Sequence, residues 1–184
     1  MAREDNLPSQ PADTQQSSAD SINPDYDLQR LCQALDEIDA LDDGEPATRF
    51  FLRARAQWAS GRRVQPIRCM DEAIRIAPKN PMFRRQRANY LIQLGEWAEA
   101  LYDCEVWVRW RPSEALAYCA RGRCYAFYDN YLRAQEDYSK AIEINPTVAL
   151  FYKLRSVAFQ RSGWTCDADR DEELAEALEA KPAD

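Results

Sequence analysis

Residues 115–148 read ALAYCARGRCYAFYDNYLRAQEDYSKAIEINPTV, and this stretch decides the fold. It holds two runs of apolar residues at helical spacing, separated near Asp129, and it closes at Pro146. The pattern returns with a period of 34 residues, as the positions of Pro78, Pro112 and Pro146 show. Such a period is typical of a stacked helical-repeat array, in which one helix hairpin cannot bury its apolar face without neighbours.

Three further columns of residues follow the same period. One column is arginine throughout: Arg53, Arg87, Arg121 and Arg155. The next position is always small, so that two helix backbones can approach closely: Ala54, Ala88, Gly122 and Ser156. The third column ends the first helix of each pair with residues that tolerate a left-handed backbone: Gly61, Gly95, Asp129 and Gly163.

In these residues the chain resembles the tetratricopeptide repeat family, over about residues 47–180. The resemblance implies an all-α fold, a right-handed superhelical solenoid of helix hairpins that spans residues 47–184. Its four units are expected near 47–80, 81–114, 115–148 and 149–181.

The N-terminal quarter of the chain has a different composition. Residues 1–25 are polar, so we expect a disordered tail. Residues 26–46 predict an acidic amphipathic helix that caps the first unit with one apolar face: Leu28, Leu31, Leu35, Ile38 and Leu41. It also stays open whether the acidic N-terminus, through this helix or through the tail before it, competes for the basic surface of the array.

Composition narrows the classes of function. The chain has no histidine, so a Ser-His or Cys-His nucleophile pair and an imidazole metal ligand are excluded. No Gly-rich phosphate loop is present, and the six cysteines form no CxxC pair. We therefore expect no enzyme, cofactor or metal site. The cysteines predict free thiols in a reducing, cytoplasmic compartment, and no apolar run is long enough to cross a membrane.

Charge is distributed unevenly between the helices of each pair. The four first helices, at 47–60, 81–94, 115–128 and 149–162, contain eleven Arg or Lys and no Asp or Glu. The acidic residues fall in the second helices, the turns and the two ends. In the tetratricopeptide family the first helices line a concave groove, so the resemblance implies a basic inner face and an acidic back.

Some of these cations are expected to have structural partners. Three column arginines are followed sixteen residues later by an aspartate, in the pairs Arg87 and Asp103, Arg121 and Asp137, and Arg155 and Asp171. Sixteen residues lead down one helix and back up its partner. We therefore predict bidentate bonds that hold each hairpin together. In the first unit the corresponding residue is Cys69, so that hairpin lacks the bond.

The remaining cations predict a binding surface. Columns that face the groove in the family contain Phe51, Arg55, Trp58, Arg85, Asn89, Arg123, Phe127, Lys153 and Arg161. Guanidinium groups, one amide and several aromatic rings suit an extended acidic peptide or a free C-terminal carboxylate. The hypothesis is a non-catalytic adaptor that binds such a segment of a partner protein. The plainer interpretation is that these arginines are solvated and cover apolar surface.

Other functions remain open at this point. A structural subunit of a homodimer or larger assembly would use tryptophans on or near the second helices: Trp97, Trp107, Trp110 and Trp164. A co-chaperone clamp fits less well, because Arg85 and Asn89 match it but Ala120, Leu150 and Leu154 do not. RNA binding is disfavoured, since the acidic ends of the chain would repel phosphates.

Overall fold

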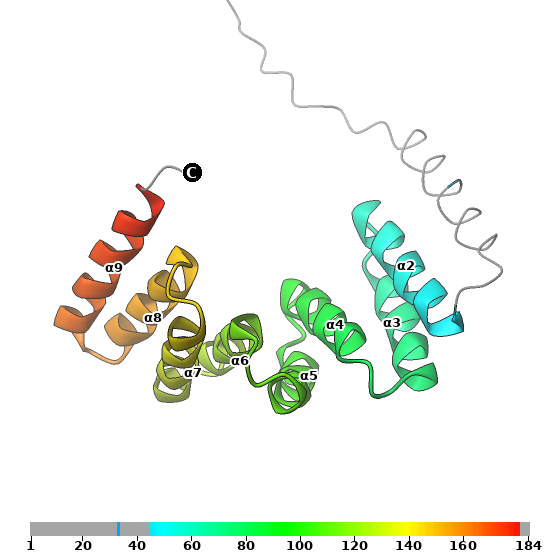
Figure 1. The fold of residues 1–184 in the computed structure, drawn as a ribbon, viewed down its shortest axis with the longest axis horizontal. Coiled ribbons are helices and arrows are strands. Elements are labelled where there is room, and N and C mark those ends of the chain that lie inside the picture. The colour runs from blue at the N-terminus through cyan, green and yellow to red at the C-terminus, as the bar shows by residue number, and fades with distance from the viewer. Residues whose placement is uncertain (1–32, 34–44, 181–184) are drawn as a thin grey trace, which may run out of the picture.

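The computed structural model describes Gln33 and residues 45–180. Within these residues the chain forms eight α-helices and no strand (Figure 1). The helices are α2 (Pro46–Ala59), α3 (Val64–Ile76), α4 (Pro81–Leu94), α5 (Trp97–Trp110), α6 (Ala115–Phe127), α7 (Tyr131–Ile144), α8 (Ala149–Arg161) and α9 (Thr165–Glu179). The predicted tail over 1–25, and the predicted capping helix up to residue 44 except for Gln33, lie outside the described residues.

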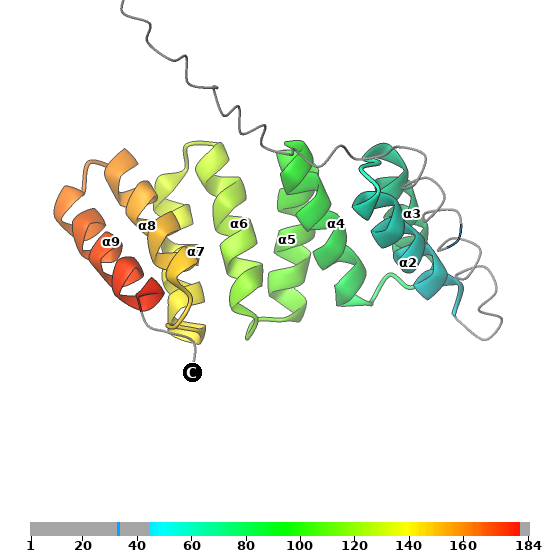
Figure 2. The same ribbon diagram turned by 90° about the horizontal axis from the view of Figure 1, so that it is seen from above.

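The helices pack as consecutive antiparallel hairpins that stack into an open arc. Figure 1 shows α2, α4, α6 and α8 toward the inside of the arc, and Figure 2 shows the hairpins side by side along it. Each hairpin packs against the next, and first helices of neighbouring units also meet, α4 with α6 and α6 with α8. The prediction of an all-α solenoid is confirmed.

The ends of the first helices follow from single residues. Gly95 ends α4 with φ of 81°, a left-handed conformation that costs glycine little. Asp129 occupies the same column after α6 and takes φ of 55° without being glycine. Asparagine and aspartate reach this region more easily than other residues, so the turn is preserved. At the start of α4, Asn80 Oδ1 accepts a hydrogen bond from the Met82 amide, and Pro81 occupies the first turn.

The column of small residues sets the distance between the two helices of a hairpin. Ala54, Ala88 and Ser156 are fully buried. A Cβ atom placed on Gly122 would lie 2.8 Å from Cε1 of Tyr138, which is also buried. The backbone of α6 therefore approaches α7 more closely than any side chain at residue 122 permits.

Buried residues connect neighbouring units as well. Trp107 is 1% exposed and belongs to one core cluster with Ala117, Ala120 and Cys124 of α6. This indole therefore fills the joint between the second and third units. None of the described helices is long and apolar enough to cross a membrane.

The described cysteines are all free thiols. Cys104, Cys119 and Cys124 are buried, Cys69 is half-buried and Cys166 is exposed. Burial raises the pKa of the Cys119 thiol to about 11. The described residues contain no group of cysteines and carboxylates arranged to hold a metal ion.

Candidate functional site

The three arginine–aspartate pairs lie in contact inside their hairpins. In each pair, Nε and Nη2 of the guanidinium both donate to the carboxylate, at 2.7 and 2.8 Å for Arg87 with Asp103, 2.9 and 2.7 Å for Arg121 with Asp137, and 2.7 and 2.7 Å for Arg155 with Asp171. All three aspartates are buried. These arginines are thus engaged with their own hairpins and are not free to hold a ligand's carboxylate.

Two of these arginines also reach the preceding unit, a contact that the sequence reasoning missed. Arg87 Nη1 donates to Asp71 Oδ1 at 2.6 Å, and Arg155 Nη1 donates to Ser139 Oγ at 3.0 Å. The signal was present, because each of these partners lies sixteen residues before its arginine. Arg84 adds a further bond to Asp103 at 2.9 Å. The arginine column therefore connects neighbouring units as well as the helices of one hairpin.

The pairs hold their guanidinium groups charged. The hydrogen bonds to Asp137 raise the pKa of Arg121, and those to Asp171 raise the pKa of Arg155. Burial raises the pKa of the Asp137 carboxyl, because the low-dielectric interior penalises its ionised form. Arg121 opposes that penalty, so the ionised carboxylate depends on its partner.

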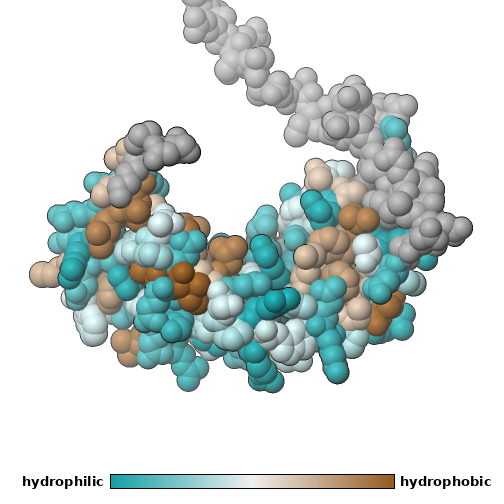
Figure 3. All heavy atoms as spheres, in the orientation of Figure 1, coloured by the Kyte–Doolittle hydropathy of each residue, from teal (hydrophilic) through white to brown (hydrophobic). Residues whose placement is uncertain are grey.

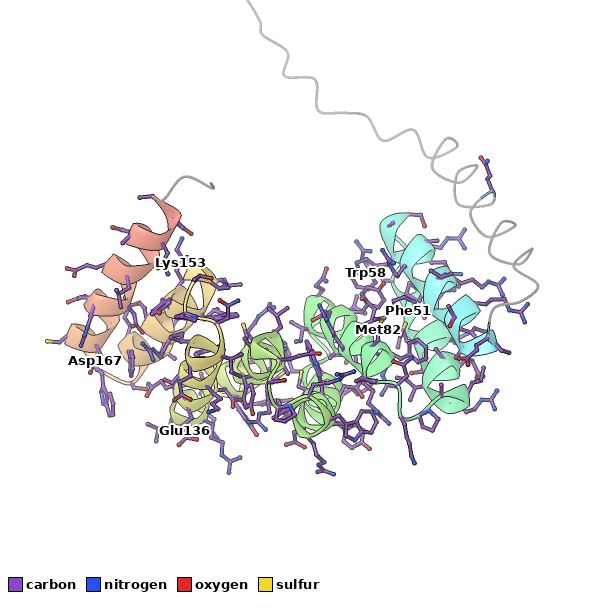
Figure 4. All side chains as sticks on the ribbon, in the orientation of Figure 1. Phe51, Trp58, Met82, Glu136, Lys153 and Asp167 are labelled. Atoms are coloured by element: carbon purple, nitrogen blue, oxygen red, sulfur yellow. The ribbon has the colours of Figure 1, made fainter. Side chains whose placement is uncertain are left out.

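The two aromatic residues predicted to face the groove from α2 lie across the joint between the first two units. Trp58 stacks on Tyr90 of α4 with ring centroids 4.1 Å apart, and Phe51 lies 5.6 Å from Phe83. Figure 4 shows Phe51 and Trp58 on the side of α2 that faces α4. Both side chains are half-buried, because each ring packs against an aromatic ring of the next unit. Arg55 lies over Phe51 at 5.7 Å from the ring centroid.

The other residues of the predicted groove differ in what they contact. Phe127 is 54% exposed, with one face stacked on Trp97 at 4.6 Å. Asn89 is half-buried on α4. Lys153, labelled on α8 in Figure 4, has its Nζ 2.6 Å from Glu179 Oε1. The structure thus pairs Lys153 with the acidic last helix, which leaves it less available to a ligand.

Four arginines on the first helices share one property. Among the described residues, no carboxylate lies within ion-pairing distance of Arg55, Arg85, Arg123 or Arg161. Arg55, Arg123 and Arg161 are exposed. Arg85 is half-buried, with its guanidinium 5.4 Å from the centroid of the Trp107 ring. No described carboxylate therefore neutralises these four guanidinium groups.

A cavity of about 390 Å³, here termed the edge pocket, lies beside Arg85 where three units meet. Its lining residues are Arg85, Ser113, Glu114, Ala115, Leu116, Ile144, Asn145, Val148 and Phe151. Figure 3 shows apolar atoms between α6 and α8 on this face, next to hydrophilic atoms over α4. The sequence reasoning missed the pocket, because its lining comes from loops and helix ends in three different units.

The four tryptophans of the alternative interpretation do not form one exposed surface. Trp107 is buried and its Nε1 donates to Glu114 Oε2 at 2.7 Å. Trp97 is half-buried against Phe127. Trp110 and Trp164 are 37% and 51% exposed, at the end of α5 and just before α9.

Comparisons with known proteins were informative at the level of family and fold. No model of a known protein family matches the chain. The chain is 35% identical over 130 residues to a DnaJ homolog subfamily C member 7 homolog of Dictyostelium discoideum, which covers 68% of this chain and 23% of that protein. It is 33% identical over 86 residues to human tetratricopeptide repeat protein 13, which covers 46% of this chain and 10% of that protein. The chain thus spans less than a quarter of the length of either relative.

Solved structures share the fold at low sequence identity. A structure titled MamA 41-end from Desulfovibrio magneticus RS-1 superposes with a TM-score of 0.77 at 18% identity, over 88% of this chain and 93% of that one. A second structure of MamA gives a TM-score of 0.74 at 16% identity, over 85% and 94%. The repeats in the sequence, the relative named for this repeat and the shared solenoid fold place the chain in the tetratricopeptide repeat family.

Proposed function

We propose that the chain is a non-catalytic adaptor that binds an acidic peptide segment of a partner protein on its basic inner face. The observation that carries the proposal is the sorting of charge. The first helices α2, α4, α6 and α8 contain no acidic residue, whereas the second helices contain fifteen: 2 in α3, 3 in α5, 3 in α7 and 7 in α9. Asp103, Asp137 and Asp171 have a structural reason to lie there, because they pair with arginines of the first helices. The rest of the sorting has no such reason, because exposed charges contribute little to stability.

The cations that would meet the ligand are Arg55, Arg85 and Arg123, on three successive inner helices. In the described part of the chain no acidic group neutralises any of them, unlike Arg87, Arg121 and Arg155. A guanidinium presents a planar set of donors that matches a carboxylate, so each of the three can hold one acidic side chain. Free thiols throughout the described core fit a reducing, cytoplasmic setting.

The proposal is tested by exchanging the three arginines for glutamine and measuring binding of a fluorescent glutamate-rich peptide by anisotropy. We expect the triple variant of Arg55, Arg85 and Arg123 to lose binding while its helicity and melting temperature stay close to those of the parent. A matched control removes the same charge from the second helices, at Arg68, Arg109 and Arg170, which are all exposed. Equal loss of binding in both triple variants would show that net charge, not the inner face, controls recognition.

A second candidate, a structural subunit of a homo-oligomer, is supported by exposed aromatic side chains outside the inner face. Tyr102 and Trp110 of α5 are 58% and 37% exposed, and the Arg84 guanidinium lies 5.6 and 5.7 Å from their rings. Light scattering after size exclusion separates the candidates. An apolar interface persists at high salt, whereas recognition by the arginines weakens.

A further inference from the structure

The edge pocket is a local feature of one joint in the array. The same position one repeat earlier is a cavity of about 120 Å³, lined by Asn80, Pro81, Met82, Arg85, Trp107, Arg111 and Glu114. Five of these residues lie 34 positions before a residue that lines the edge pocket: Asn80, Pro81, Met82, Arg111 and Glu114. Two joints of similar geometry therefore differ about threefold in open volume.

The difference in volume follows from the side chains at equivalent positions. Trp107 helps to fill the smaller cavity, and its equivalent one unit later is Ala141. Trp110 has Ile144 as its equivalent in the edge pocket. The indole that lines the smaller cavity is thus replaced by a methyl group at the later joint, which leaves more open space there. A volume of about 390 Å³ lies within the range of roughly 300–1,000 Å³ in which proteins bind small ligands.

The lining has an apolar interior and a charged rim. Phe151 is 1% exposed and Ala115 is 9% exposed, so they form the floor, whereas Leu116 is 48% exposed at the mouth. Arg85 contributes a guanidinium with no carboxylate partner among the described residues. Glu114 is the opposite charge on the rim, and Trp107 Nε1 already holds its Oε2. An incoming carboxylate is therefore directed to Arg85 and away from Glu114.

Arg85 belongs to the edge pocket and to the inner face at the same time. We infer that the edge pocket takes one bulky apolar side chain of the acidic partner segment, while Arg85 binds the carboxylate of a neighbouring acidic residue in that segment. The inference rests on the proposed function and specifies its ligand: an internal acidic stretch interrupted by one large aliphatic or aromatic residue. Burial of the apolar residue supplies affinity, and the flanking charge supplies the register.

The chain offers closely matched variants for a test. Leu116 is the second residue of α6, and Leu132 is the second residue of α7, where it is 61% exposed and outside the pocket. Leu116→Gln thus removes apolar surface at the pocket, and Leu132→Gln removes the same surface at an equivalent helix position elsewhere. Arg85→Gln is matched in the same way by Arg109→Gln on α5, because Arg109 is exposed and does not line the pocket.

The experiment selects peptides from a random display library, with each peptide placed between two linkers so that it has no free C-terminus. The full chain is the bait. We expect the enriched peptides to share one large apolar residue flanked by Asp or Glu. Leu116→Gln and Arg85→Gln should each weaken binding of a selected peptide by about tenfold, while Leu132→Gln and Arg109→Gln leave it unchanged.

A double-mutant cycle links the apolar residue of the peptide to the pocket. Changing that residue to alanine should cost about tenfold with the parent chain and nothing further with Leu116→Gln. Fully additive losses, or the absence of an enriched apolar–acidic motif, would overturn the inference. Acidic peptides that depend on Arg55 and Arg123 but ignore Leu116 would overturn it and leave the proposed function standing. Peptides that ignore all three inner-face arginines would overturn both.

Discussion

Removing the guanidinium of Arg121 tests how the hairpins are held together. Arg121 donates two hydrogen bonds to Asp137, whose side chain is 6% exposed. Arg121→Ala leaves that carboxylate buried without its cation. A buried carboxylate left without its partner is expected to lower the free energy of unfolding by about 2–4 kcal/mol. The buried carboxyl can avoid its charge by taking up a proton. At pH 7, about three units above the ordinary pKa of aspartate, protonation costs about 4 kcal/mol, at about 1.4 kcal/mol per pH unit, and this sets an upper limit on the penalty for the unpaired carboxylate.

The same reasoning predicts how the cost depends on pH. Without Arg121, burial and, to a smaller extent, the charge of Glu136 raise the pKa of Asp137 in the folded state above the unfolded value. The folded variant then binds the proton more tightly than the unfolded chain. Its stability deficit is therefore full above the folded pKa and disappears below the unfolded pKa of about 4. We expect the gap between the parent and Arg121→Ala to narrow as pH falls from about 7 to 4.

Urea unfolding followed by far-ultraviolet circular dichroism measures these differences, with Arg109→Ala as a surface control. Arg87→Ala provides an internal comparison, because Asp103 keeps a bond to Arg84 at 2.9 Å and is not left alone. The carboxylate penalty should accordingly be smaller there. If Arg121→Ala costs no more than Arg109→Ala, or if its deficit is the same at both ends of the pH range, the pair does not hold the hairpin as described.

Three further predictions concern packing, thiol reactivity and the N-terminal segment. Gly122→Leu should lower the melting temperature and destabilise the fold by about 1–3 kcal/mol, because its Cβ would lie 2.8 Å from the Tyr138 ring; an unchanged melting temperature would contradict the close approach. Iodoacetamide at about pH 8 should alkylate Cys166 and spare Cys119 in the folded chain, as peptide mass mapping can check. Deleting residues 1–25 should raise affinity for an acidic peptide at low salt if that tail competes for the inner face, and an unchanged affinity at every salt concentration would exclude competition by the tail.

Much of the architecture was accessible from the sequence because it depends on local, periodic information. The 34-residue period, the small column and the helix-ending column each report a requirement of one hairpin, which every unit repeats. The arginine–aspartate contacts were predictable for the same reason. Residues sixteen apart lie on the two helices of one hairpin, at positions that face each other across the connecting turn. Charge sorting between first and second helices also needed no coordinates.

Tertiary structure decided which side chains are exposed and unpaired, and so able to contact a ligand, because this depends on neighbours from other units. Trp107, expected near an outer surface, is buried against α6, and Lys153 is held by Glu179 of α9. One face of the Trp58 ring is covered by Tyr90, whereas Arg55, one turn earlier on the same helix, remains exposed. The edge pocket lies between residues of three units, and at the equivalent earlier joint the Trp107 indole lines a smaller cavity. A repeat period specifies which positions meet, but the volumes of the side chains that meet there decide whether a joint closes or stays open.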